Sequence, residues 1–253
     1  MYQSYEHKIG YHGALPLTEQ VDTIPAIGWN KNAKNVFIVS MVESTPILRI
    51  SGETYGALIS KSEFENFHLK LKVRWGNIKW NPRKDKLMDS GICYFAQGDP
   101  GVDYWRTWML SQEMQIMEGH LGDYWNIAHS AIDIKAYIPE GSMCAVASEK
   151  ASFISVGTGT GNTGFVMRQS DYEKPKGDWN EIELICYQGK SIHIVNGHVV
   201  MILQHSRYHT LQGDFPLTRG KLQIQSEGCE VYYKELKIKE LKSLSGKYQE
   251  LFL

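Results

Sequence analysis

The chain has 253 residues, and its 27 basic and 28 acidic side chains give a formal net charge of −1. This balance creates no overall field for nucleic acid or an anionic membrane, so we expect no nucleic-acid partner. The densest basic run, Arg83-Lys84-Asp85-Lys86, contains an acid and is expected to be a solvated loop. No apolar run approaches the roughly 20 residues that cross a bilayer, which predicts no membrane span.

The start of the chain, MYQSYEHKIGYHG, contains no apolar stretch of the kind found in signal peptides, so we expect no signal peptide here. We expect a single domain over residues 1–253, with an irregular N-terminal extension over 1–25. The cysteines lie far apart without a CxxC pair, which favours free, mostly buried thiols over disulfides or a zinc site; they are Cys93, Cys144, Cys186 and Cys229.

Hydrophobic residues recur with a period of two through most of the chain. In NFHLKLKVRWG (66–76) apolar residues alternate with basic residues and a histidine, which predicts a half-buried antiparallel strand. Asn196-Gly197 predicts a type I′ hairpin turn. The run Gly157–Gly164 is expected to be a flexible loop, and 243–253 is the one stretch that could hold a short helix. About a dozen such strands are too many for one open sheet, which predicts an all-β, two-sheet antiparallel β-sandwich of jelly-roll type.

The stretch Ser111–Trp125, SQEMQIMEGHLGDYW, begins as a strand with an unusual polar face. Its alternation places Glu113 and Gln115 on one face, and Met114 and Ile116 on the other. A carboxylate beside an amide is more typical of a ligand cleft than of a solvated surface, so we expect Glu113 to belong to a site. Further along the chain, Gln223, Gln225 and Glu227 share one face of another strand, and the two strands could line one concave sheet.

The loop that follows the first strand is dense in acids, a histidine and aromatics. Sugar rings stack on Trp side chains, and sugar hydroxyls need fixed polar partners, so His120, Asp123 and Trp125 indicate a carbohydrate ligand. Glu118 would face away from Glu113 unless the chain bends. Because the spacing of these residues matches no established zinc or calcium loop, we expect no metal and no cofactor, with a divalent metal as the open alternative.

Several segments together carry a family likeness. They are, in order, NFHLKLKVRWG, DSGICYF, SQEMQIMEG with GDYW, DWNEIEL, IVNGHVV and LQIQSEGCEVYYKELKIKEL. Over residues 50–241 the chain resembles the 3-keto-disaccharide hydrolase domain family. The resemblance implies a concanavalin A-like jelly roll and bacterial enzymes, often periplasmic or secreted, that act on glycosides whose C3 hydroxyl is oxidised to a ketone. Asp89 and Lys234 depart from the Asn and Arg common in the family, which leaves the exact substrate open.

A ketone at C3 makes the proton on C2 acidic, so one positioned carboxylate can start an elimination that releases the C1 substituent, and water can then add. Our hypothesis assigns Glu113 as the general base, with Gln115 orienting a hydroxyl or water. The full set comprises catalytic residues Glu113, Glu227 and His120, and substrate-binding residues Gln115, Glu118, Asp123, Trp125 and Gln225.

Two other functions remain open. A non-catalytic carbohydrate-binding module would use the same side chains but would tolerate loss of the Glu113 charge. A laminarinase-type glycosidase usually carries several acids on one strand, whereas Gln115 follows Glu113 here and an amide cannot exchange protons. The sequence leaves the sugar, the linkage, the compartment and the oligomeric state undetermined.

Overall fold

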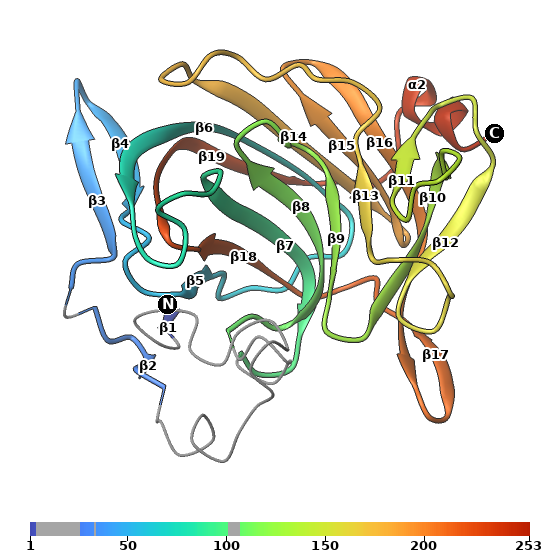
Figure 1. The fold of residues 1–253 in the computed structure, drawn as a ribbon, viewed down its shortest axis with the longest axis horizontal. Helices are drawn as coiled ribbons and strands as arrows, with labels where there is room; N and C mark the ends of the chain where they lie inside the picture. The colour runs from blue at the N-terminus through green and yellow to red at the C-terminus, as the bar shows by residue number, and fades with distance from the viewer. Residues whose placement is uncertain (4–25, 33, 101–106) are drawn as a thin grey trace.

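The computed structural model describes residues 1–3, 26–32, 34–100 and 107–253 (Figure 1). Within them the chain forms nineteen strands, where the sequence predicts about a dozen, because several strands have only two to four residues. They fold into two layers, which makes the protein an all-β antiparallel sandwich of the concanavalin A-like jelly-roll class. No helix among the described residues has the length and apolar character needed to cross a bilayer.

The first layer, sheet A, has the strand order β2-β1-β5-β18-β7-β8-β9-β13-β11. All neighbours in it are antiparallel except β11 and β13, which are parallel. Its strands are β1 (Tyr2–Gln3), β2 (Gly28–Trp29), β5 (Gly56–Ile59), β7 (Asp89–Gln97), β8 (Leu110–Met117), β9 (Tyr124–Ile127), β11 (Ala145–Ala147), β13 (Phe165–Met167) and β18 (Lys221–Ser226).

The second layer, sheet B, has the order β3-β4-β19-β6-β14-β15-β16-β10-β12, and β17 extends β16 as a hairpin. The end of β10 also pairs with β11, which joins the two sheets. The strands of sheet B are β3 (Phe37–Val42), β4 (Thr45–Ile50), β6 (Phe67–Lys79), β10 (Ser130–Tyr137), β12 (Phe153–Gly157), β14 (Asn180–Tyr187), β15 (Lys190–Val195), β16 (His198–Thr210), β17 (Gly213–Pro216) and β19 (Cys229–Glu240).

Local expectations from the sequence are largely confirmed. Asn196 and Gly197 both have positive φ, as a type I′ hairpin requires, and 246–252 is helical as α2 (Gly246–Gln249) and a 3-10 turn (Glu250–Phe252). All four cysteines are free thiols, and only Cys144 is not buried. Two expectations change. First, β1 makes residues 2 and 3 part of sheet A, although most of 1–25 lies outside the described residues. Second, the glycine-rich turn after β12 is held by hydrogen bonds, including one from Asn162 Nδ2 to the Ser155 carbonyl at 2.8 Å.

A buried histidine ties the two sheets together. His193 on β15 is fully buried, not at a surface or a cleft. Its Nδ1 lies 3.0 Å from the Gly122 carbonyl, which only accepts, so Nδ1 donates and Nε2 is left to accept from the Tyr94 hydroxyl at 3.3 Å. Burial lowers the pKa of His193 to about 4, although the bond to Gly122 opposes the shift. The neutral ring therefore fastens the turn between β8 and β9 onto sheet B.

This histidine should make stability depend on pH. Since its folded pKa lies below the ordinary 6.5, the unfolded chain binds the proton first. The stabilisation is complete above pH 6.5 and is lost as the pH falls toward about 4. Between pH 7 and pH 4 we expect wild type to lose about 3 kcal/mol more of its free energy of unfolding than His193→Gln. Urea unfolding at several pH values between 7 and 4 measures this loss. An equal change in the free energy of unfolding with pH for both proteins would contradict the prediction.

Candidate functional site

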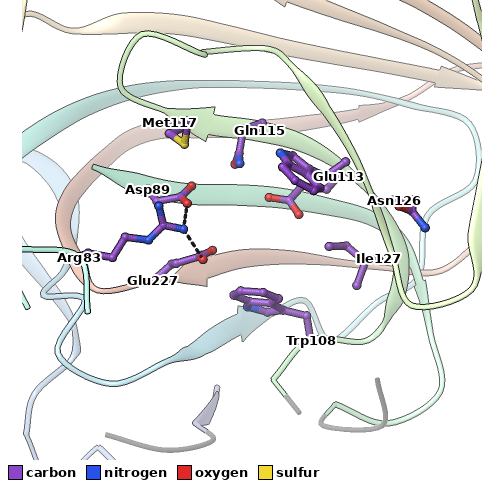
Figure 2. Close-up of a pocket in the computed structure, with 10 residues that line it drawn as sticks. Arg83, Asp89, Trp108, Glu113, Gln115, Met117, Asn126, Ile127 and Glu227 are labelled. Atoms are coloured by element: carbon purple, nitrogen blue, oxygen red, sulfur yellow. Dashed lines mark hydrogen bonds and ion pairs between the residues drawn. The ribbon is translucent and has the colours of Figure 1, made fainter. Parts of the chain in front are cut away.

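A pocket of about 270 Å³ lies on the face of sheet A that points away from the core (Figure 2). Side chains from β7, β8 and β9, from the segments before β7 and β8 and from the turn after β18 line it. They are Arg83, Asp89, Trp108, Glu113, Gln115, Met117, Trp125, Asn126, Ile127 and Glu227. Its volume lies near the lower end of the range for ligand pockets, about 300 Å³, which suits one ring-sized group.

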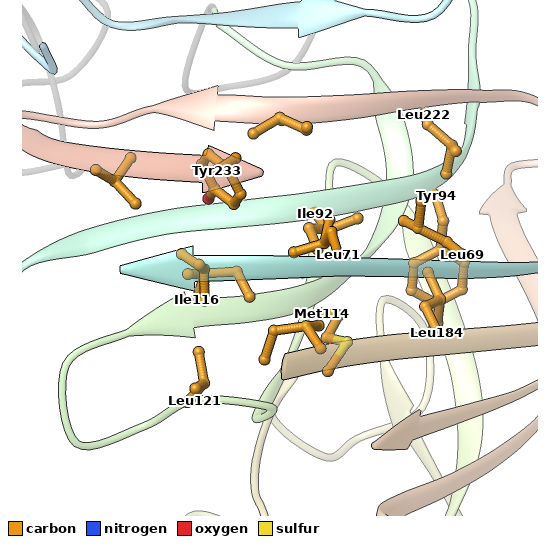
Figure 3. Packing of buried hydrophobic residues seen from close by; sticks show 14 of the residues in the cluster. Leu69, Leu71, Ile92, Tyr94, Met114, Ile116, Leu121, Leu184, Leu222 and Tyr233 are labelled. Atoms are coloured by element: carbon orange, nitrogen blue, oxygen red, sulfur yellow. The ribbon is translucent and has the colours of Figure 1, made fainter. Parts of the chain in front are cut away.

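The alternation along β8 produces this pocket as the sequence predicts. Glu113 and Gln115 line it, while Met114 and Ile116 point to the opposite side into the hydrophobic core (Figure 3). Glu113 is only 3% exposed, so its carboxylate lies inside the pocket rather than in bulk solvent. The side-chain oxygen of Gln115, Oε1, accepts a hydrogen bond from the backbone N–H of Ile116 at 3.1 Å. The side-chain nitrogen of Gln115 takes no part in this bond.

The lack of a side chain at Gly91 makes room for Glu113. Gly91 on β7 is paired with Gln115 on β8, and the register places Gln225 of β18 on its other side. A methyl group on Gly91 would lie 2.0 Å from Glu113 Oε1 and 2.6 Å from Gln225 Oε1. Both side chains therefore converge over this glycine. Gln225 is fully buried beside the pocket and does not line it.

A buried guanidinium holds two more carboxylates at the pocket. Arg83 forms ion pairs with Asp89 and, at 2.8 Å, with Glu227 (Figure 2). Burial disfavours the charge of Arg83, but the neighbouring Glu227 and Asp89 carboxylates raise its pKa above the ordinary value. Burial also raises the pKa of the Tyr55 hydroxyl, although the positive charge of Arg83 opposes the shift, so Tyr55 stays a neutral phenol. The expectation that the loop 83–86 is solvated is wrong for Arg83 and correct for its three exposed neighbours.

Two tryptophan side chains also line the pocket. Trp108 is buried, and its ring nitrogen donates to the Gly56 carbonyl at 3.3 Å. Trp125 is 38% exposed and packs against Phe165 with ring centroids 4.7 Å apart. The pocket thus combines a polar floor with two indoles, one fixed and one partly open to solvent. The neighbouring Tyr104 and Trp105 lie outside the described residues.

The structure does not bring Glu118, His120 or Asp123 to this pocket. His120 Nδ1 lies 2.9 Å from Asp123 Oδ2, and Arg168 donates its backbone N–H to Asp123 Oδ1 at 2.8 Å. Burial raises the pKa of Asp123, although hydrogen bonds from Arg168 and His120 oppose the shift. Glu118 accepts the Met88 amide at 3.3 Å outside the pocket. These contacts fix the β8–β9 turn, and within the described residues no group of three or more His, Cys, Asp or Glu side chains is placed to hold a metal.

Of the residues expected at the site, Glu113, Gln115, Trp125 and Glu227 meet in the pocket. Sequence reasoning missed six lining residues, which are Arg83, Asp89, Trp108, Met117, Asn126 and Ile127. A signal existed for two of them. Asp89 is paired with Met117 and lies two residues before Gly91, so the same period of two places both on the pocket face. Arg83 comes from a loop, where no such period applies.

The fold and the site together place the protein among β-sandwich proteins that carry a pocket of polar and aromatic side chains on one sheet. The sequence model of the 3-keto-alpha-glucoside-1,2-lyase-like domain matches residues 26–239, and the chain belongs to this family. None of the curated proteins matches this chain.

Several solved structures are similar to this chain at low identity. Two candidate glycosyl hydrolases from Parabacteroides distasonis are 16% and 20% identical, each with a TM-score of 0.48. The alignments cover 84% of this chain and 93% of the first, and 82% and 85% for the second. A carbohydrate binding module from Bacillus subtilis is 6% identical with a TM-score of 0.43, covering 81% of this chain and 92% of the module.

The Arg83 ion pairs should be costly to break. Arg83→Gln leaves Asp89 and Glu227 buried side by side without their shared cation, so we expect the free energy of unfolding to fall by about 3–5 kcal/mol at pH 7. The matched control is Arg219→Gln, because Arg219 is 62% exposed and pairs with Glu63 at the surface, where such pairs contribute less than about 1 kcal/mol. Urea unfolding measures both, and equal small losses would contradict the role of Arg83.

Proposed function

We propose that this protein cleaves the glycosidic bond of 3-keto-glycosides in the pocket on sheet A, by elimination started at C2. Its family membership makes it a carbohydrate-active, glycosyl hydrolase-like protein. The observation that carries this proposal is the position of Glu113, a carboxylate 3% exposed on a central strand, in a pocket also lined by two indoles that suit a sugar ring.

The ketone determines which chemistry the pocket needs. Glu113 takes the proton from C2, and the electrons of that C–H bond pass to the C3 oxygen as an enolate. When the ketone re-forms, a C1–C2 double bond forms and the C1–O bond breaks. Because C1 and C2 are adjacent, the same carboxyl group can return its proton to the leaving oxygen. Addition of water to the resulting enone gives the free 3-keto sugar, so that the net reaction is hydrolysis.

The other lining residues have roles suited to this route. Arg83 places a fixed positive charge at the pocket, which stabilises negative charge as it develops on the enolate oxygen. Glu227 and Asp89 hold that guanidinium in place, so we assign Glu227 a positioning role rather than the catalytic role expected from sequence. Gln115 presents an amide nitrogen for a sugar hydroxyl, and Trp125 offers its partly exposed ring to an apolar sugar face.

The assay compares p-nitrophenyl glucoside with its 3-keto form at equal concentration and follows nitrophenolate. We expect wild type to release it from the keto form alone, since only the ketone acidifies C2. Glu113→Gln should lower that rate at least about 100-fold, because the amide cannot accept the proton. The matched control is Glu240→Gln at an exposed position on β19 in the other sheet, which should keep the wild-type rate.

Each other outcome points to a different function. Equal cleavage of the plain glucoside would indicate a conventional glycosidase. Binding of the keto form without release, unchanged in Glu113→Gln, would indicate a carbohydrate-binding module.

A further inference from the structure

A second elongated depression crosses the outer face of sheet B, away from the core. Two hollows of about 330 and 480 Å³ meet at Trp179 and Lys234, and we call them together the Trp179 groove. The β3–β4 hairpin, which projects at one edge of the molecule (Figure 1), contributes Val42 and Glu43 to the first hollow, and Lys174 lines the second. The pocket on sheet A shares none of these residues.

Arg74, Tyr232 and Lys234 reach this groove because their strands alternate. Val73 and Tyr233 point into the core, so the residues beside them in sequence point outward. The register pairs Arg74 with Tyr232 across β6 and β19, and Lys234 with Lys72. The floor of the groove is therefore a row of basic and aromatic side chains.

The pairing of charges on this face is uneven. Arg49 meets Glu230 at 2.8 Å, Lys70 meets Glu181 at 2.6 Å and Lys72 meets Glu235 at 3.0 Å. Within the described part of the chain, Arg74 and Lys234 have no carboxylate within 4.0 Å, and both line the groove.

Aromatic rings hold these two cations instead. Lys234 Nζ lies 4.3 Å from the centroid of the Trp179 ring, and Arg74 Cζ lies 4.9 Å from the same ring and 5.2 Å from that of Tyr232. Each such contact at an exposed site contributes only about 0.5–1 kcal/mol. Two like charges that share one indole repel each other, so an anion between them would be stabilised by both.

We propose that the Trp179 groove binds an acidic glycan chain, with the carboxylate or sulfate of one sugar held between Arg74 and Lys234. The guanidinium fork suits the two oxygens of either group, and the shared indole fixes the position of both cations. Two joined hollows suit a chain of several sugars better than a single small anion. That the ligand is a carbohydrate rests on the proposed function, whereas its negative charge follows from the two cations alone.

The probes are an oligouronate, a sulfated gluco-oligosaccharide and a neutral gluco-oligosaccharide of equal length, titrated calorimetrically against the full chain. We expect the acidic probes to bind, more weakly as salt rises, and the neutral one not to bind. In the double variant Arg74→Gln/Lys234→Gln, affinity should fall at least about tenfold. Lys61→Gln/Lys150→Gln removes the same charge at exposed positions outside the groove and should bind as wild type does.

Comparison of the two acidic probes tells carboxylate from sulfate. Failure of both to bind, or an equal loss in the control variant, would overturn the proposal, as would tighter binding of a single-stranded oligonucleotide of the same charge. Glu113→Gln should bind the acidic probe as wild type does, so the result stands apart from whether the sheet A pocket cleaves 3-keto-glycosides.

Discussion

The pocket depends on a space that only glycine leaves open. Over Gly91, at the centre of sheet A, the side chains of Glu113 and Gln225 approach from the two neighbouring strands. Any larger residue would occupy the position that Glu113 Oε1 now takes. A flat sheet face is normally covered by its own side chains, and one missing Cβ turns part of it into the floor of a pocket. The carboxylate is then held by rigid strands rather than by a loop, which suits a catalytic group.

Charge is the second constraint on the same site. Three carboxylates, Asp89, Glu113 and Glu227, line one small pocket, and like charges at close range disfavour one another. Arg83 meets two of them and is itself held in the charged form by them. In a partly buried site this guanidinium acts more strongly than it would in water. The cation that makes the acidic site tolerable is also the group to which our proposal assigns the enolate oxygen.

How much of this could be predicted from sequence depends on which element carries each residue. Strand alternation fixes the face of a side chain, so the position of Glu113 beside Gln115 was predictable, as was the sandwich itself. The period could not place His120 and Asp123, because Gly119 and Gly122 adopt positive φ and turn the chain away from the pocket. Nor could it place Arg83, whose side chain enters the pocket from a loop. Its direction is set by Asp89, on the strand that follows, and by Glu227, which lies far away in sequence.

Strand alternation gives both sheets a polar outer face, but the two faces differ in how much of their polar side chains is buried. On sheet A the polar face is covered, and Glu113, Gln115 and Glu227 are all buried, so a charge there is in a setting where proton transfer can be tuned. On sheet B the polar face is open, and several of its cations are matched by a carboxylate on an adjacent strand. Arg74 and Lys234 instead contact aromatic rings, where the β3–β4 hairpin lines a groove. The outer face of sheet A is thus enclosed at its pocket, whereas the outer face of sheet B presents an open groove lined by Arg74 and Lys234.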